Sequence, residues 1–274
     1  MKYKLPKKLE LGFYLWLAIV PIFCIGLDLI LSITNPVDVP PFGLRTRDFD
    51  ISFMAQSIYL SVWVGALTSI YGIINTIAFF KPDAMPKWVV NKNFFTALIA
   101  VTFVQFLVYN LNLIYQKSTN KQTIGFNTWY NIIKSILEHM LTPILMFTFY
   151  YLFPKSIVKD KDYMKKYSWL NYIFLTMYVT FAITRAALEI KYYPGARDES
   201  MGYNPFPYPQ LDWQKVGVGV FIVGIIGLYV ALWLIAVFFN YTSNLVYAKQ
   251  NNLANEKKPR KVAKDSKKRT KNIE

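Results

Sequence analysis

The stretch NIIKSILEHMLTPILMFTFYYLF, residues 131–153, is apolar for long enough to cross a lipid bilayer as one helix. It contains His139, the only histidine of the chain. Ser135, Thr142 and Pro143 lie three or four residues from His139 and therefore share one face of a helix with it. Pro143 has no amide hydrogen to bond to the carbonyl of residue 139, so we expect the helix to bend at the histidine.

The composition predicts an all-α, polytopic membrane protein. Apolar residues make up 54% of the 274 residues and aromatic residues 18%, and the apolar residues form several long unbroken runs. The net charge is +15, but the basic residues lie between the apolar runs and at the C-terminal end. This distribution is typical of membrane orientation signals, so we expect no specific nucleic-acid partner.

The apolar runs predict a bundle of six transmembrane helices over residues 1–247. The first run is too long for the core of a signal peptide and has no small-residue cleavage site after it, so we expect it to be retained. Residues 248–274 contain mostly polar and basic side chains, which cannot bury a core, and are expected to form a disordered basic tail. The predicted spans cover approximately residues 11–33, 51–80, 94–115, 131–153, 169–188 and 216–240.

Basic residues also predict the orientation of the bundle. With the N-terminus inside, most of them fall on the cytoplasmic side, so we expect both termini in the cytoplasm and the chain in the plasma membrane of a bacterium. Membrane lipid is then the expected partner. The tail either contacts anionic lipid headgroups or serves as a topology signal that keeps the chain soluble after synthesis; contact with nucleic acid or the ribosome is the less favoured third reading.

Strongly polar residues within the spans fall mainly in the half that this topology places outside. Such residues are rare in spans unless they face the bundle interior, so they predict a polar pocket that opens outward around Glu138 and His139. For Arg185 alone, an ion pair with Glu189 at the membrane surface is the favoured reading. We expect no cofactor and no metal, because the chain has one cysteine, Cys24, and one histidine. The expected pocket residues are Asp28, Met54, Gln56, Gln105, Tyr109, Asn112, Thr142 and Arg185.

Three motifs resemble one family, the androgen-induced six-span membrane hydrolases and their bacterial relatives. HMLTP at residues 139–143 is similar to the family's histidine followed four residues later by proline. PFPYPQLD at residues 205–212 is similar to its Tyr-Pro-Tyr-Pro-Phe-Leu-Asp stretch, and FMAQSI at residues 53–58 looks like its aromatic-Thr-x-Gln-Ser-Asn. The resemblance covers residues 1 to about 247. It implies a threonine nucleophile paired with the histidine, which cleaves lipid esters such as fatty acid esters of hydroxy fatty acids.

The chain departs from that pattern at the nucleophile. Met54 stands at the threonine position, and a thioether cannot be deprotonated or acylated. Ser57 lies one turn further on and is a substitute candidate, although a hydroxyl bonded to its own helix is the favoured reading. Ile58 replaces the family's asparagine.

Two functions therefore remain open. In a lipid-ester hydrolase, His139 would be the general base, Ser57 the nucleophile, Gln56 or Gln105 an oxyanion donor, and Glu138 or Asp28 the group that orients the imidazole. The alternative is a non-catalytic protein of the same fold that binds a lipid or another amphiphile. A transporter is less favoured, because the sequence shows no internal repeat and its polar groups lie away from the midplane. A channel is also less favoured, because the sequence contains no stretch typical of a selectivity filter.

Overall fold

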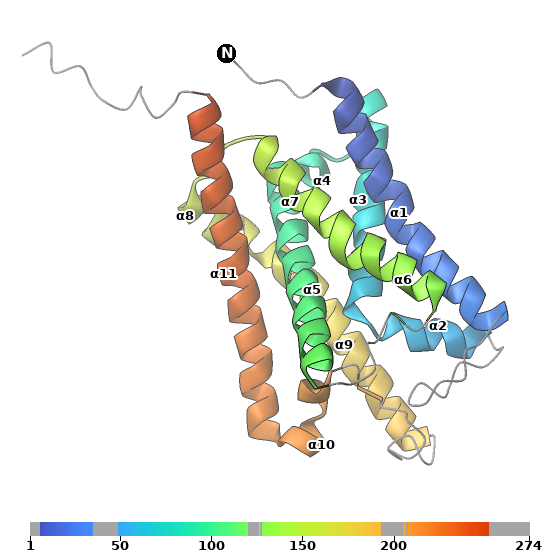
Figure 1. The fold of residues 1–274 in the computed structure, drawn as a ribbon. Helices are drawn as coiled ribbons and strands as arrows, with labels where there is room; N and C mark the ends of the chain where they lie inside the picture. The colour runs from blue at the N-terminus through green and yellow to red at the C-terminus, as the bar shows by residue number, and fades with distance from the viewer. Residues whose placement is uncertain are drawn as a thin grey trace, which may run out of the picture.

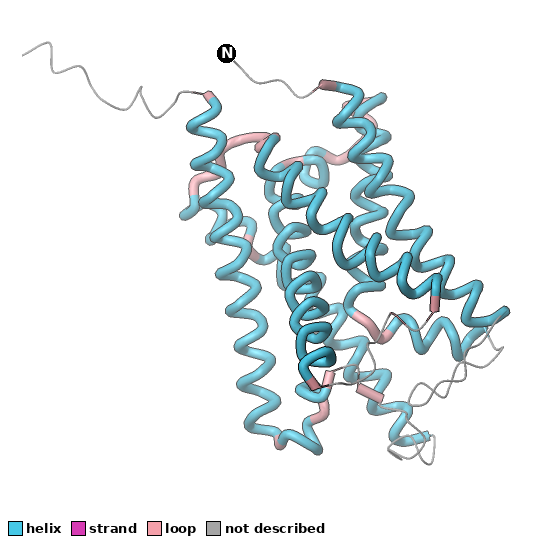
Figure 2. Tube along the Cα trace, in the orientation of Figure 1, coloured by secondary structure: helices cyan, strands magenta, loops and turns pink. Residues whose placement is uncertain are grey.

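Helices are the only regular secondary structure in the described part of the chain (Figure 2). The computed structural model describes residues 6–34, 49–119, 126, 128–192, 205–206 and 208–251. Six of the helical segments in these ranges are long and apolar enough to cross a membrane. The prediction of an all-α integral membrane protein with six spans is therefore confirmed. The predicted disordered tail, residues 248–274, lies outside the described residues beyond Asn251.

All but one of the membrane-length helices extend past at least one end of the apolar runs from which they were predicted. The fourth span is a composite of two α-helices and a π-helical turn, η1. The spans are α1 Lys7–Thr34, α3 Leu60–Phe80, α5 Lys92–Ser118, α6 Trp129–Ile136 with η1 Leu137–Leu141 and α7 Thr142–Leu152, α9 Trp169–Tyr192, and α11 Val218–Gln250. Shorter helical elements are α2 Phe49–Ser57, α4 Lys87–Val90, α8 Asp160–Asp162, η2 Tyr163–Tyr167, η4 Pro209–Leu211 and α10 Trp213–Val216.

The second span differs from the single helix that was predicted over residues 51–80. It begins at Leu60, and α2 lies across the end of the bundle rather than in line with α3 (Figure 1). Tyr59 between them has an extended backbone. Side chains bond the carbonyls freed at this break: the Tyr178 hydroxyl donates to Ile58 O at 2.8 Å and the Trp63 indole donates to Ser57 O at 2.8 Å. Thirty residues exceed what one crossing needs, and the surplus forms α2.

Helix α5 is the centre of the bundle, where it contacts α3, α7, α9 and α11 (Figure 1). An aromatic cluster fills the space between α1, α3, α5 and α7. In it, Phe13 stacks on Phe149 with ring centroids 3.7 Å apart, and Tyr71 stacks on Phe95 at 5.1 Å. These rings bury large apolar areas at each crossing of the helices, which fixes how the helices lie against one another.

Two asparagines of α11 hold the segment that joins α7 to α9. The side chains of Asn240 and Asn244 both donate to Val158 O, at 2.9 and 2.6 Å, and Asn240 donates to Asp160 Oδ1 at 2.6 Å. Asn244 Oδ1 accepts from the backbone N–H of Val158 and from the ammonium of Lys92. These bonds satisfy the backbone groups of Val158, which lies before α8 in a stretch without regular structure.

The contact between α1 and α3 depends on a missing side chain at Gly72. A Cβ at this position would overlap the backbone of α1, at 2.6 Å from Leu17 C and 2.8 Å from Ala18 Cα. Backbone atoms cannot move aside as the end of a side chain can, so the two helices would have to separate. Gly72 therefore sets the distance between the first two spans.

We expect Gly72→Ala to lower the free energy of unfolding by about 1–3 kcal/mol, the range for overpacked interiors. Each kcal/mol corresponds to a fall of roughly 2–4 °C in melting temperature for a chain of this size. Thermal unfolding of the purified protein in detergent measures the change. Gly26→Ala is the matched control, because a Cβ there meets nothing within 4 Å. Equal melting temperatures for both variants would contradict the close contact.

Candidate functional site

The fourth span changes its hydrogen-bond pattern at the histidine. The N–H of Thr142 bonds to Leu137 O, five residues back, and Pro143 has no N–H to give. In place of the predicted bend the span contains this π-helical turn, and α6 and α7 continue as one rod across the bundle (Figure 1). Within the turn, Glu138 and His139 are only 3% and 8% exposed. π-Helical turns of this kind occur frequently at functional sites.

His139 packs against two side chains of α5. Its ring is stacked on that of Tyr109, with centroids 3.7 Å apart and an angle of 4° between the planes. Gln105, one turn earlier on α5, places its amide Nε2 3.4 Å from His139 Nδ1 and is itself buried. The structure therefore brings together three of the residues that the sequence assigned to one pocket.

A charged cluster lies on the other side of the same turn. Lys134 Nζ bonds to Asp28 Oδ2 of α1 at 2.6 Å, and both side chains are largely buried. Glu138 lies close enough to Lys134 and Asp28 to interact electrostatically with both. Lys134 was not among the residues predicted for the site. A lysine four residues before Glu138 in an apolar run was the available signal, because residues at this spacing share a helix face.

Ser57 makes a local bond rather than a catalytic one. Its hydroxyl donates to Met54 O at 2.9 Å, within its own helix, which agrees with the favoured reading of this serine. Thr142 accepts a hydrogen bond from the Trp16 indole at 3.1 Å, and Asn112 is exposed. Neither Thr142 nor Asn112 forms a hydrogen bond with His139. Gln56 lies at the end of α2, and its buried amide nitrogen has no hydrogen-bond partner among the described residues.

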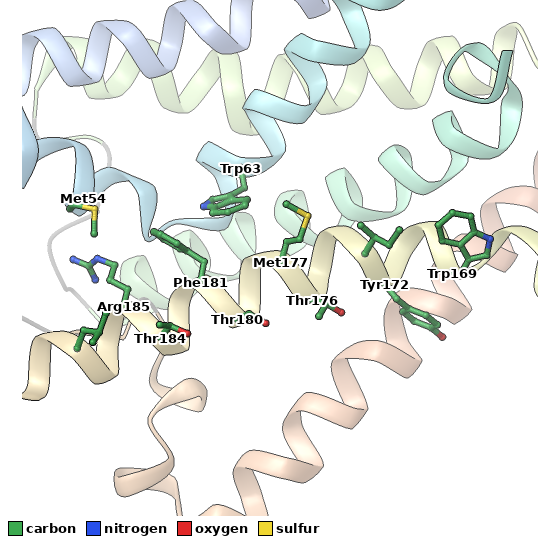
Figure 3. A pocket seen from close by; sticks show the side chains of 12 residues that line it. Met54, Trp63, Trp169, Tyr172, Thr176, Met177, Thr180, Phe181, Thr184 and Arg185 are labelled. Atoms are coloured by element: carbon green, nitrogen blue, oxygen red, sulfur yellow. The ribbon is translucent and has the colours of Figure 1, made fainter. Parts of the chain in front are cut away.

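A groove of about 960 Å³ runs along one face of α9 (Figure 3). Met54 of α2 and Trp63, near the start of α3, lie on its other side. Of the predicted site residues, only Met54 and Arg185 line it, so the groove is separate from the surroundings of His139. The groove residues from α9 form two neighbouring rows, each with a residue every four positions, and the two rows make one broad stripe along the helix. The full lining is Met54, Trp63, Trp169, Tyr172, Ile173, Thr176, Met177, Thr180, Phe181, Thr184, Arg185 and Leu188.

The groove is apolar along its length and charged at one end. Arg185 Nη2 pairs with Glu189 Oε1 at 2.5 Å, the partner favoured from the sequence, but both side chains are largely buried in the protein instead of lying at the surface. Arg185 Nη1 also donates to Pro205 O at 3.4 Å. Near the other end, Thr176 Oγ1 and the Tyr229 hydroxyl of α11 lie 2.6 Å apart, which joins α9 to α11. Among the described residues, no three His, Cys, Asp or Glu side chains are placed to hold a metal ion.

The proline-rich segment before the last span packs onto the charged end of the groove. Phe206 is almost fully buried in an apolar cluster that includes Tyr178 and Ala182 of α9. Tyr208 packs against the same cluster. Burial raises the pKa of Tyr208 to about 12, so its phenol stays protonated at neutral pH and faces the Tyr178 hydroxyl. This segment covers the end of α9 and serves a structural role there.

Comparisons with known proteins add no further assignment. A scan against protein-family models, a search of curated proteins and a search of solved structures each found no match.

We expect Tyr109→Leu to shift the ring-proton resonances of His139 downfield, because the substitution removes the aromatic ring stacked on the imidazole. It should also cost about 0.5–1.5 kcal/mol of stability beyond the lost buried area. The single histidine of the chain makes its NMR signals unambiguous. Tyr115→Leu is the control, since this exposed tyrosine lies further along the same helix. Unchanged histidine signals in the Tyr109 variant would contradict the stack.

Proposed function

We propose that this integral membrane protein binds a lipid or another amphiphile in the groove along α9. The observation that carries the proposal is the length and uniformity of the lining stripe. It runs from Trp169 to Leu188, and twenty helical residues extend about 30 Å, the thickness of the hydrocarbon core of a bilayer. A groove of that length matches an extended acyl chain.

The chemistry of the lining supports an occupant with one polar end. The volume of the groove, about 960 Å³, lies within the range of ligand sites in proteins, roughly 300–1,000 Å³. Thr176, Thr180 and Thr184 form a row at intervals of four residues on an otherwise apolar face. At the end near Met54, the Arg185–Glu189 pair offers both a donor and an acceptor to a headgroup.

The orientation of the site is part of the same proposal. On the positive-inside rule we place both termini in the cytoplasm of a bacterial cell, with the basic tail available to anionic headgroups. The α9 helix then runs outward, and Arg185 lies toward the non-cytoplasmic surface. The polar end of the amphiphile would face outward, as the sequence analysis expected for the pocket.

Membership of the androgen-induced six-span family remains a proposal of ours. The six-span architecture supports it. The activity of that family is a second candidate function. Its support is the buried His139 beside Gln105, together with the buried carboxylate of Glu138. Ser57 would have to leave the carbonyl of Met54 before it could act as a nucleophile.

The groove is tested by filling it with a larger side chain. We expect Thr180→Trp to reduce the lipid that co-purifies with the protein at least tenfold, equivalent to about 1.4 kcal/mol of binding free energy. Native mass spectrometry after mild delipidation counts the lipids retained by each molecule.

Val223→Trp is the matched control, because Val223 lies on α11, is highly exposed and does not line the groove. Melting temperatures near that of the wild type show that both variants are folded. If the two variants retain lipid equally, the groove is not the binding site.

The hydrolase candidate has its own test, in which a long-chain fatty acid ester of a hydroxy fatty acid is the probe. If His139 is the general base, His139→Ala should slow ester cleavage by about 10²–10⁴-fold. Ser57→Ala should abolish cleavage if that hydroxyl is the nucleophile. Turnover by the wild type that His139→Ala leaves intact would exclude the role of the imidazole, while the lipid retention measured for Thr180→Trp is judged independently.

A further inference from the structure

The cluster between α1, α3 and the fourth span is not electrically balanced if both of its acids are ionised. Lys134 and Asp28 are 2.6 Å apart and neutralise each other. Glu138, 3% exposed, adds a second carboxylate beside the same lysine. A net charge buried at membrane depth is costly, and ionisable groups there occur in pairs or in sites of function. Two carboxylates and one ammonium become neutral when they bind one proton.

We propose that Asp28, Lys134 and Glu138 form a proton-binding site and that Glu138 carries the proton. The ammonium of Lys134 is already engaged by Asp28 at close range. Neither oxygen of Glu138 accepts a hydrogen bond of good geometry in the described part of the chain, although the Ser61 hydroxyl is close enough to interact with it. Two carboxylates that share one site do not both ionise readily, and the one without the lysine takes the proton.

The surroundings of Glu138 leave room for the protonated form. Gly65 of α3 faces its side chain, and a Cβ at that position would lie 3.9 Å from Glu138 Oε1. The proton comes from water and returns to water: the carboxylate gains one O–H bond, and no other covalent bond changes. Glu138 then becomes a neutral donor beside the hydroxyl of Ser61.

The other titratable groups near the cluster do not supply the balancing charge. The Gln105 amide nitrogen can only donate, so Nδ1 of His139 accepts and the imidazole is neutral. A thiol and phenols in these surroundings are neutral as well. The titratable groups that face the cluster from the elements packed around it are Cys24 and Asp28 of α1, Tyr59 before α3, Tyr109 of α5, and Lys134 and His139 of the fourth span.

Infrared spectroscopy of the full chain in bilayer nanodiscs of zwitterionic lipid at pH 7 tests the charge balance. Exposed carboxyls are ionised at this pH, so the carboxylic-acid C=O band reports protonated buried acids. The wild type should show one such band, and Glu138→Gln should lose it. Asp28→Asn should lose it too, because Lys134 then pairs with an ionised Glu138. Lys134→Gln should roughly double it, because both acids must then be neutral.

Two controls separate this site from other acids and from the histidine. Asp83→Asn removes an exposed carboxyl and should leave the band unchanged, and His139→Gln should also retain it. Melting temperatures and elution volumes monitor folding. If Lys134→Gln fails to fold, loss of the band in both Asp28→Asn and Glu138→Gln still supports a shared proton on the cluster. A wild type without the band, or a band that survives in Glu138→Gln or Asp28→Asn, would overturn the proposal.

Discussion

The hydrocarbon core of a membrane offers no water to polar groups, and this constraint governs the structure. A charged or amide side chain at membrane depth is costly unless it finds partners on neighbouring helices or on its own helix. Lys134 meets Asp28 across the α1–α6 contact, and Arg185 meets Glu189 along α9. These pairs are worth little as sources of stability, since removing charges from water offsets most of their attraction. The value of the Lys134–Asp28 pair lies in fixing which faces of α1 and α6 meet.

The groove and the charged cluster are separate, but the break between α2 and α3 touches both. Trp63, which lines the groove, bonds to the carbonyl of Ser57, and Tyr178 bonds to the next carbonyl. Ser61, on the first turn of α3, faces Glu138 of the cluster. The groove and the charged cluster therefore border the same short junction. A continuous helix over this region would have no such element.

The sequence was sufficient for the fold and for part of the site. Apolar runs of membrane length identify spans almost without regard to packing, and for this reason the six helices could be predicted. His139, Gln105 and Tyr109 could be assigned to one place, because helical spacing and depth along each span position them. Pro143 marked where the helix would deviate but not the π-helical form of the deviation.

The remaining features depend on contacts between distant residues. The break before α3 is bonded by Tyr178, from a helix far along the chain, and no local signal encodes that bond. Lys134 lies near the start of its span, where a lysine ordinarily reaches the interface. From the sequence alone, the apolar stripe on α9 indicates a helix surface that faces lipid. Only the position of α2 and α3 beside it makes it a groove.

The asparagines that α11 contributes to the preceding segment also bear on biosynthesis. The ribosome makes α11 after the other five described spans, so the backbone of Val158 and the carboxyl of Asp160 cannot bond to Asn240 and Asn244 until α11 has been synthesised. Until then the segment lacks these partners, and its backbone groups need others. The contact between α11 and this segment therefore forms only after the other five spans have been made.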